Sequence, residues 1–394
     1  MSAGPLVFLV AAEASADAIG ARLMAALKTA TDGRVRFAGI GGTAMAEEGL
    51  ESLVHFGELN VMGIIEVLPH VPRILRHIGE TAKAALDLRP DAVVTIDAPS
   101  FSFRLGRKLR GKGLLLVHYV APTVWAWRPR RARMIARFLD HLLCVLPFEL
   151  PYFEKVGLPA SFVGHSVIEQ DGISPDGPGF RRRHGIADDA PLLCVLPGSR
   201  VGEVNRLAPV FGAVVARLAA KHEGLRVVVP TVAPVAALVR SQAAQWRVQP
   251  VVVEGTAEKH HAFAASTAAL AASGTVNLEL AVAGVAFVIA YRVTWLSYGI
   301  GRLLVKVPSI VMTNLLVGRN VIPEFLQQDC RADLIAPVVE RLLTSLEARE
   351  EQRAGSHEAA FRLGLGGPSP SRNAAKIILD LIAGRAKLAP IPPT

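Results

Sequence analysis

The sequence predicts an α/β protein built from two doubly wound halves, each a parallel sheet with helices on both faces, with a cleft between the halves. Short apolar runs alternate with longer helical patterns along the chain. Most of these runs contain consecutive Val, Leu or Ile instead of a strict alternation, which is typical of strands buried on both faces. A stretch rich in Gly, Pro, Asp and Ser, QDGISPDGPG at 170–179, marks the boundary between the halves.

Strand–helix–strand units account for the first half. Its predicted strands are Leu6–Val10, Arg36–Ile40, Ala92–Ile96, Leu114–Tyr119 and His141–Val145. The helical stretch Ala18–Thr29 joins the first two, and such connections form parallel sheets. Leu6–Ala12 resembles the apolar part of a secretory signal. However, no Lys or Arg precedes Arg22 and Glu13 interrupts the run, so a buried strand is favoured.

The second half follows the same pattern. Its predicted strands are Leu192–Leu196, Arg226–Val229, Pro250–Val253, Ala268–Ala271 and Phe287–Ala290, with a helix at Arg206–Lys221. Ala262–Leu278 lacks charged residues, but it is rich in Ala, Ser, Thr and Gly, which favours a buried helix–turn–helix over a membrane span of about 20 strongly apolar residues. A helix at Asn373–Ile382 is expected to pack back on the first half. The expected domains are therefore 1–170, 171–350 and a C-terminal helical segment, 351–394.

Charge and composition limit the class of partner. The 394 residues include 43 Lys and Arg against 34 Asp and Glu, a net charge of +9, which favours a phosphate ligand or an anionic membrane surface. Nucleic acid is disfavoured because aromatic residues are only 6% and none form an RNA-binding run among basic residues. The three Cys residues are far apart, and no metal-binding motif is present, so we expect neither a disulfide framework nor a metal site.

The turn Leu196–Arg200 is the first candidate for chemistry. It follows a strand and precedes a helix, an arrangement that favours phosphate binding at the helix N-terminus. Gly198 permits close approach of the backbone, Ser199 is a candidate helix cap, and Arg200 offers a forked donor. The alternative is an ordinary strand–turn–helix with a solvated Arg.

A second small-residue turn, Ser273-Gly274-Thr275, also opens a helix, Val276–Ala283. Glu279 lies one helical turn further on the same face. A carboxylate among Ala, Val and Leu is costly without a partner, and the two hydroxyls of a ribose would supply one. The alternative is a helix cap followed by an unrelated Glu.

Two further groups follow strands of the first half. Asp97 comes directly after Ala92–Ile96, at the strand ends where open α/β sheets bind ligands, and it is a candidate general base or a turn-former beside Pro99. Glu13, Ser15 and Asp17 follow the first strand and are candidates to contact a polar substrate. The alternative is that Ser15 or Asp17 caps the next helix.

The stretch Leu59–Ile78 is densely apolar at Val61–Leu68 and ends in basic residues. The run Trp127–Arg133 contains four Arg. Together they suit an anionic lipid surface, although a core helix pair and a solvated helix face are the alternatives.

These motifs together resemble the bacterial lipid-A-disaccharide synthase family, which are glycosyltransferases of the GT-B fold with two Rossmann-like domains facing a cleft. The matching segments run from about residue 6 to 345 and include AEASAD (12–17), TIDAPSF (95–101), HYVAPTVWAWRPRR (118–131), LPGSRVGEV (196–204) and ASGTVNLE (272–279). HYVAPTVWAW and the block Leu304–Gln327 are highly specific. A UDP-N-acetylglucosamine 2-epimerase or a MurG-like transferase is the nearest alternative, but these enzymes lack HYVAPTVWAW. A two-lobed binding protein without catalysis is the alternative from another class. Such proteins are normally exported, and the sequence favours a buried strand over a secretory signal at Leu6–Ala12.

The resemblance implies a reaction. UDP-2,3-diacylglucosamine donates its sugar, with inversion, to the 6-hydroxyl of 2,3-diacylglucosamine 1-phosphate (lipid X), giving a β-1,6-linked disaccharide 1-phosphate and UDP. It further implies an N-terminal domain for the acceptor lipid and the membrane, and a C-terminal domain for the UDP-sugar. The family is cytoplasmic, binds the inner-membrane surface and uses neither metal nor cofactor. Some members form homodimers by exchange of the C-terminal part.

The resemblance also assigns residues. Asp97 matches the proposed general base, and Arg200 matches an Arg that is needed for activity and faces the UDP phosphates, so the resemblance implies that both are catalytic. The UDP-binding residues are Gly198, Ser199, Arg200, Ser273, Gly274, Thr275 and Glu279, and the polar residues of the cleft are Glu13, Ser15 and Asn314. The chain departs from the family at Ala16, usually Gly, and at Ser100, usually a second Asp, which leaves Asp97 as the candidate base.

Overall fold

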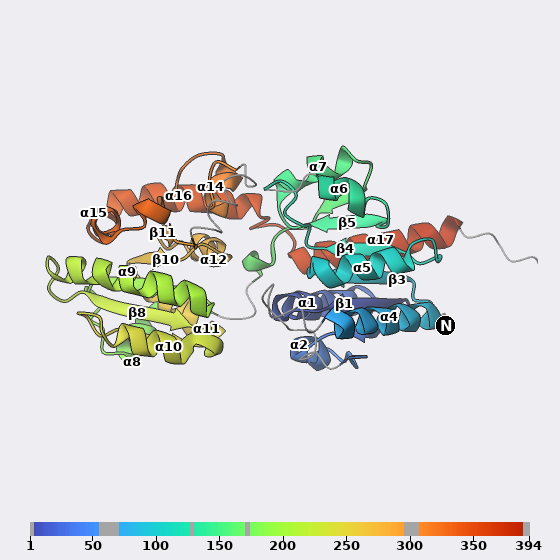
Figure 1. Ribbon diagram of the computed structural model, residues 1–394, viewed down its shortest axis with the longest axis horizontal. Coiled ribbons are helices and arrows are strands. Elements are labelled where there is room, and N and C mark those ends of the chain that lie inside the picture. Colours follow the sequence, from blue (N-terminus) through green and yellow to red (C-terminus); the bar gives the residue numbers. More distant parts are fainter. Residues whose placement is uncertain (1–3, 55–70, 127–129, 170–173, 295–306, 389–394) are drawn as a thin grey trace, which may run out of the picture. The chain divides into compact units, whose positions relative to one another are not determined.

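The computed structural model describes residues 4–54, 71–126, 130–169, 174–294 and 307–388. The chain forms two compact units, one of residues 1–169 with 366–394 and the other of residues 170–365. Each unit is a parallel sheet of six strands between helices (Figure 1). The two doubly wound α/β halves predicted from the sequence are confirmed.

The sheet of the first unit has the strand order β2-β1-β3-β4-β5-β6. The strands are β1 (Leu6–Ala11), β2 (Arg36–Ile40), β3 (Ala92–Ile96), β4 (Leu116–Tyr119), β5 (His141–Cys144) and β6 (Ala160–Phe162). The helices are α1 (Ala14–Ala30), α2 (Thr43–Glu47), α4 (Val71–Leu88), α5 (Pro99–Leu109), α6 (Arg130–Ile135), α7 (Leu150–Glu154) and α17 (Pro370–Leu388), with short 3₁₀ turns η3 (Pro147–Glu149) and η4 (Ser166–Ile168). Because β1 leads to β2 on one side and β3 leads to β4 on the other, the strand order reverses between β1 and β3.

Helices cover both faces of this sheet. On one face, buried side chains of α4, α5 and α6 pack on β1, β3, β4 and β5, with Phe8, Phe101 and Phe138 among them. The expected C-terminal helix is present as α17, which packs against α1. The amide of Asn373 Nδ2 donates to the carbonyl of Val163 (3.0 Å), and the backbone N–H of Ser371 donates to Glu169 Oε1 (2.7 Å). These contacts fix α17 to the first unit.

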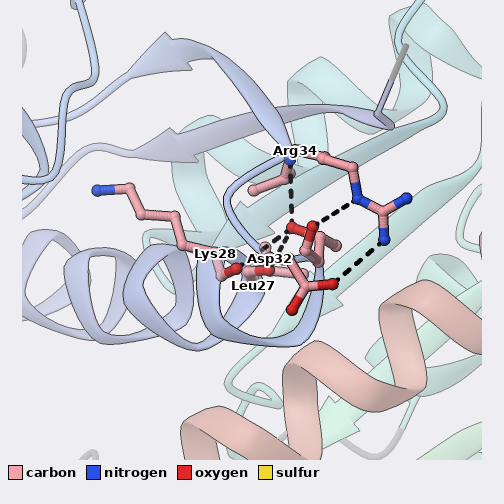
Figure 2. Close-up of polar contacts among 6 residues, drawn as sticks. Leu27, Lys28, Asp32 and Arg34 are labelled. Carbon is pink, nitrogen blue, oxygen red and sulfur yellow. Dashed lines mark hydrogen bonds and ion pairs between the residues drawn. The ribbon is translucent and has the colours of Figure 1, made fainter. Parts of the chain in front are cut away.

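The turn from α1 into β2 shows how the chain reverses at a helix end. Thr31 Oγ1 donates to the carbonyl of Leu27 (2.8 Å), and Asp32 and Gly33 both adopt left-handed conformations. Figure 2 shows that Arg34 Nε donates to the carbonyl of Thr31 (2.9 Å), while its guanidinium lies 3.5 Å from Asp32. The ion pair is exposed, so the backbone bonds fix this turn.

The sheet of the second unit has the order β12-β11-β10-β7-β8-β9. The strands are β7 (Leu192–Leu196), β8 (Arg226–Thr231), β9 (Val251–Glu254), β10 (Ala268–Ala271), β11 (Phe287–Tyr291) and β12 (Glu324–Leu326). The helices are α8 (Gly177–Arg183), α9 (Val201–Ala219), α10 (Ala233–Ala243), α11 (Thr256–Ala265), α12 (Val276–Val282), α14 (Met312–Val317), α15 (Ala332–Thr344) and α16 (Leu346–Arg362), with a 3₁₀ turn η5 (Gln327–Asp329). The strand order reverses between β7 and β10.

Three expectations differ from the structure. The helix–turn–helix expected at Ala262–Leu278 is wrong, because β10 lies between the end of α11 and the start of α12. Two strands, β6 and β12, were not predicted; they are three residues long and lie at the sheet edges. Finally, α16 packs against α12 and α14 in the second unit, so residues 351–365 do not group with α17 as expected.

Candidate active site

The site residues predicted in the first unit lie where the strand order of its sheet reverses. Strands β1 and β3 are neighbours, and Ala11 pairs with Ile96 at their carboxyl ends. Glu13 follows β1 and Asp97 follows β3. Open α/β sheets bind ligands at this reversal point, outside the carboxyl ends of the strands. The sheet topology therefore brings Glu13 and Asp97, which are 84 positions apart in the chain, to one edge.

Asp97 sits on a strained backbone. Asp97 and Ala98 have φ of 48° and 43°, in the left-handed region that non-glycine residues avoid. Two bonds hold this conformation: the N–H of Asp97 donates to the carbonyl of Tyr119 (2.9 Å), and Ser102 Oγ donates to the carbonyl of Asp97 (2.7 Å). Such strain costs about 1–3 kcal/mol per residue and is concentrated at functional sites.

The carboxyl group of Asp97 is half-buried. Burial raises its pKa above the ordinary value, and the backbone N–H of Ala98 offsets part of the rise. A carboxylate with a raised pKa is a stronger base, which suits removal of a proton from a hydroxyl group. Asp97 thus has a raised pKa and lies at the strand-order reversal of its sheet.

The neighbours of Glu13 have separate roles. Glu13 is the N-cap residue of α1 and is half-buried, and Ser15 is exposed in the first turn. Asp17, by contrast, is buried, and its carboxylate accepts the backbone N–H groups of Gly42 (2.7 Å), Ala44 (3.0 Å) and Met45 (3.1 Å). These bonds cap α2, so Asp17 is a structural residue.

A buried carboxyl group that the sequence analysis missed lies at the same edge, after β5. Glu149 accepts hydrogen bonds from the backbone N–H of Leu146 (3.0 Å) and from Trp125 Nε1 (3.3 Å). Trp125 also packs edge-on against Phe148, with ring centroids 5.2 Å apart. The bonds join the segment that follows β4 to the turn that follows β5. Burial raises the pKa of Glu149 to about 8 despite the two N–H donors.

A second missed residue, His118, lies on β4. Its side chain is fully buried, and Nδ1 is 2.8 Å from Oγ1 of Thr95 on the neighbouring strand. Burial, with help from the charge of Arg131, lowers the pKa of His118 to about 3. The imidazole is therefore neutral at physiological pH and is held in place by Thr95.

In the second unit, the two predicted UDP-binding turns lie side by side where the strand order reverses. Ala271 of β10 pairs with Leu196 of β7, and the N–H of Ala272 donates to the carbonyl of Leu196 (2.8 Å). The turn 197–200 follows β7, and the turn 273–275 follows β10. Residues about 75 positions apart thus form one edge of the site.

The turn after β7 differs in detail from the expectation. Gly198 has φ +117°, as a close approach requires. Ser199 does not cap α9; the N-cap residue is Arg200, and no side chain fills that role. Instead, Glu203 Oε2 accepts the backbone N–H of Ser199 (3.0 Å). Arg200 is 72% exposed at its side chain, so its guanidinium is open to a ligand.

The turn after β10 consists of small residues that leave the backbone accessible. Ser273 is half-buried, whereas Gly274 and Thr275 are not buried. Ser273 Oγ donates weakly to the carbonyl of Ile310 (3.4 Å). Glu279, on α12, is paired with the ammonium group of Lys259 on α11. The partner predicted for Glu279 from the sequence was the pair of ribose hydroxyls, whereas in the structure its partner is Lys259.

Asn314 is the one predicted site residue with no free hydrogen-bonding capacity. It is buried in α14, and its Oδ1 accepts the N–H groups of Val321 (2.9 Å) and Ile322 (2.8 Å). Its Nδ2 donates to the carbonyl of Ile322 (2.8 Å) and to Ser309 Oγ (3.3 Å). Both donors and both acceptor positions are in use, so Asn314 shapes the loop after α14 and has nothing left for a substrate.

Two predicted surfaces fall partly or wholly outside the described residues: Val61–Leu68 wholly, and the run Trp127–Arg133 at its first three residues. In the part of the chain that the structure describes, no helix has the length and apolar character needed to cross a bilayer. Among those same residues, no cluster of three or more His, Cys, Asp or Glu side chains is suited to a metal ion.

Comparison with known proteins identifies relatives over nearly the whole chain. The family model described as lipid-A-disaccharide synthetase matches residues 7–375. The lipid-A-disaccharide synthase of Rhodospirillum centenum is 53% identical over 382 residues, 96% of this chain and 95% of the relative. That of Paramagnetospirillum magneticum is 49% identical over 96% of this chain and 97% of the relative.

Solved structures show the same fold at low identity. The UDP-GlcNAc 2-epimerase of Neisseria meningitidis bound to UDP-GlcNAc has a TM-score of 0.63 at 13% identity, covering 96% of this chain and 99% of that one. MurG of Acinetobacter baumannii has a TM-score of 0.56 at 14% identity, with the same coverage. At this identity the likeness extends to the fold alone.

Proposed function

The chain belongs to the lipid-A-disaccharide synthase family, and from that premise we propose how its residues carry out the transfer. It is a glycosyltransferase that forms the lipid A disaccharide. The rival assignments, a 2-epimerase or a MurG-like transferase, have only the fold in their favour. We propose UDP-2,3-diacylglucosamine as donor and lipid X as acceptor, with the acceptor held by the first unit and the UDP-sugar by the second.

Asp97 acts as general base in the proposed mechanism. Its carboxylate takes the proton of the acceptor 6-hydroxyl while that oxygen bonds to the anomeric carbon of the donor, and the bond from the anomeric carbon to the UDP oxygen breaks. A single displacement inverts the anomeric centre. Arg200 and the backbone of the turn 273–275 stabilise the negative charge on UDP, and Glu279 accepts the ribose hydroxyls. Glu13 and Ser15 contact the acceptor.

The raised proton affinity of Asp97, at the strand-order reversal of its sheet, carries this proposal. The test is Asp97→Ala, assayed with both lipid substrates by mass spectrometry of UDP and disaccharide. Loss of a general base lowers kcat by about 10²–10⁴-fold, and UDP affinity should stay unchanged. Asp87→Ala, an exposed position on α4, is the matched control. Near-normal turnover by Asp97→Ala would exclude Asp97 as the general base.

We further propose that the α5–α6 surface of the first unit docks on anionic lipid at the cytoplasmic face of the inner membrane. Residues 98–139 contain ten Lys and Arg and no Asp or Glu, so the charge of this segment, +10, exceeds the net charge of the whole chain, +9. Arg104, Arg107, Lys108, Arg130 and Arg133 are exposed on α5 and α6. On the neighbouring α4, Leu75 is 47% exposed. A basic surface with an apolar edge suits a membrane interface.

Binding to vesicles tests this surface. Neutralising Lys108→Gln and Arg133→Gln together should weaken binding to phosphatidylglycerol vesicles about 30-fold, at about 1 kcal/mol per charge. The loss should shrink in high salt. Arg372→Gln with Lys376→Gln, exposed on α17, removes the same charge elsewhere and is the control. Equal losses in both double variants would mean that net charge, and not this surface, drives binding.

A further inference from the structure

The first turn of α9 contains a buried carboxylate that the proposed reaction does not use. Glu203 is 7% exposed and is the third residue of the helix. Its Oε2 accepts the backbone N–H of Ser199 (3.0 Å), and its Oε1 accepts the hydroxyl of Tyr291 (3.1 Å). The guanidinium of Arg200 lies 3.6 Å from the same Oε1.

This arrangement changes how the turn after β7 binds an anion. A helix N-terminus attracts negative charge through its free N–H groups and its dipole. At α9 the carboxylate of Glu203 already lies in the first turn and accepts the Ser199 N–H. A diphosphate next to this turn must therefore rely on Arg200 and on the turn 273–275, which lies beside it.

The path of the turn depends on Glu203. A Cβ at Gly198 would lie 2.6 Å from Cβ and Oε2 of Glu203, so the backbone of the turn passes directly over this side chain. Only glycine permits both that approach and the φ of +117°. Arg200 is two residues further on. Because Glu203 contacts Gly198 and accepts the N–H of Ser199, it sets the path of the backbone that leads to Arg200.

Tyr291 links this turn to the rest of the edge. It is the last residue of β11, and β10 lies between β11 and β7 in the sheet. The Tyr291–Glu203 bond therefore reaches across the carboxyl end of β10, where the turn 273–275 begins. Burial and the nearby carboxylate raise the pKa of Tyr291, so its hydroxyl keeps its proton and donates to Glu203.

We propose that Glu203 and Tyr291 are positioning residues that hold the turn 197–200 beside the turn 273–275, so that Arg200 reaches the diphosphate of the bound nucleotide. The proposal rests on the proposed UDP site. It predicts that Glu203 strengthens the binding of a diphosphate although both carry negative charge, because Glu203 acts through the turn and through Arg200.

The test compares the affinity for UDP with that for uridine, which lacks phosphates, by calorimetry on the full chain. A hydrogen bond to a charged group is worth about 1.5–3 kcal/mol, so Glu203→Gln should weaken UDP binding about tenfold or more and leave uridine binding unchanged. Tyr291→Phe keeps the charge of Glu203 but removes a hydrogen bond of the same kind, so it should also weaken UDP binding about tenfold or more. Glu340→Gln, a carboxylate paired with Lys221 on another part of the second unit, and Tyr152→Phe are the controls.

Each other outcome overturns the inference in a distinct way. Equal losses for UDP and uridine would mean that Glu203 and Tyr291 only maintain the fold. Tighter UDP binding by Glu203→Gln would mean that the carboxylate merely repels the diphosphate. If the unaltered chain binds neither ligand while remaining folded, the proposed UDP site fails, and the positioning role fails with it.

Discussion

Replacement of Glu149 by glutamine should make the stability of this protein less dependent on pH between 6 and 9. Glu149 is 1% exposed, and its carboxyl group accepts the N–H groups of Leu146 and Trp125. Those donors favour the ionised form, but burial disfavours it more strongly and raises the pKa to about 8. The folded protein therefore holds a proton at Glu149 that the unfolded chain releases near the ordinary value of 4.5.

The sign and size of the effect follow from proton linkage. A group with a raised folded-state pKa contributes its full stability below the unfolded pKa, and that stability is lost as the pH rises towards the folded pKa. At 1.36 kcal/mol per pKa unit, a rise of about 3.5 units is worth about 5 kcal/mol in all. About 2.5 kcal/mol of this change falls between pH 6 and pH 9.

Glutamine at position 149 has the same shape as glutamate but has no group that titrates in this pH range. It accepts one of the two N–H donors and leaves the other poorly paired, at a cost of about 1–3 kcal/mol that does not vary with pH. Urea unfolding of both proteins at pH 6, 7, 8 and 9, followed by tryptophan fluorescence, gives the difference in free energy of unfolding. Between pH 6 and pH 9 the unaltered protein should lose about 2.5 kcal/mol of stability relative to the variant.

Glu154→Gln, at an exposed position on α7, is the control and should show no such shift. A difference between the unaltered protein and Glu149→Gln that stays constant from pH 6 to pH 9 would refute the reasoning. It would mean that Glu149 is ionised throughout and that its two N–H donors outweigh burial.

Two further predictions concern the second unit. Glu279→Gln should weaken UDP binding by about tenfold, because a neutral amide accepts the ribose hydroxyls less strongly than a carboxylate; calorimetry measures this, and unchanged affinity would exclude the ribose contact. Asn314→Ala should lower the free energy of unfolding by about 2–4 kcal/mol through unpaired backbone groups while the KM for both substrates stays the same. A raised KM without loss of stability in thermal unfolding would restore Asn314 as a substrate contact.

The ten predicted strands are all present because buried parallel strands leave a strong signal, a run of consecutive apolar residues. The missed strands, Ala160–Phe162 and Glu324–Leu326, are three residues long and only half-buried at the sheet edges, so no such run marks them. At Ala268–Ala271 the sequence is compatible with a helix as well as a buried strand, since Ala suits both. In the structure, this segment forms a strand because it pairs with β7 on one side and β11 on the other.

The sequence predicted the place in the fold of those candidate residues that lie in a local turn. Gly198, Ser273-Gly274-Thr275 and Asp97 each stand between a strand and a helix, and that order is visible in the chain. The side-chain partners were not predictable, because each comes from a distant segment. Lys259 for Glu279, Tyr291 for Glu203 and Trp125 for Glu149 lie 20, 88 and 24 positions away.

The sequence by itself determined the fold class, the family and the position of the candidate turns between strands and helices, since these depend on patterns within a few residues of one another. Only the tertiary structure decided which polar residues remain available to a ligand. Asn314 and Asp17 are polar residues of conspicuous motifs, yet all but one of their hydrogen bonds join backbone groups that the fold brings to them, and the remaining bond joins Asn314 to Ser309 Oγ. Arg200, although it lies 3.6 Å from the buried Glu203, keeps 72% of its side chain exposed. Burial and pairing depend on contacts between distant segments, and these exist only once the sheets have formed.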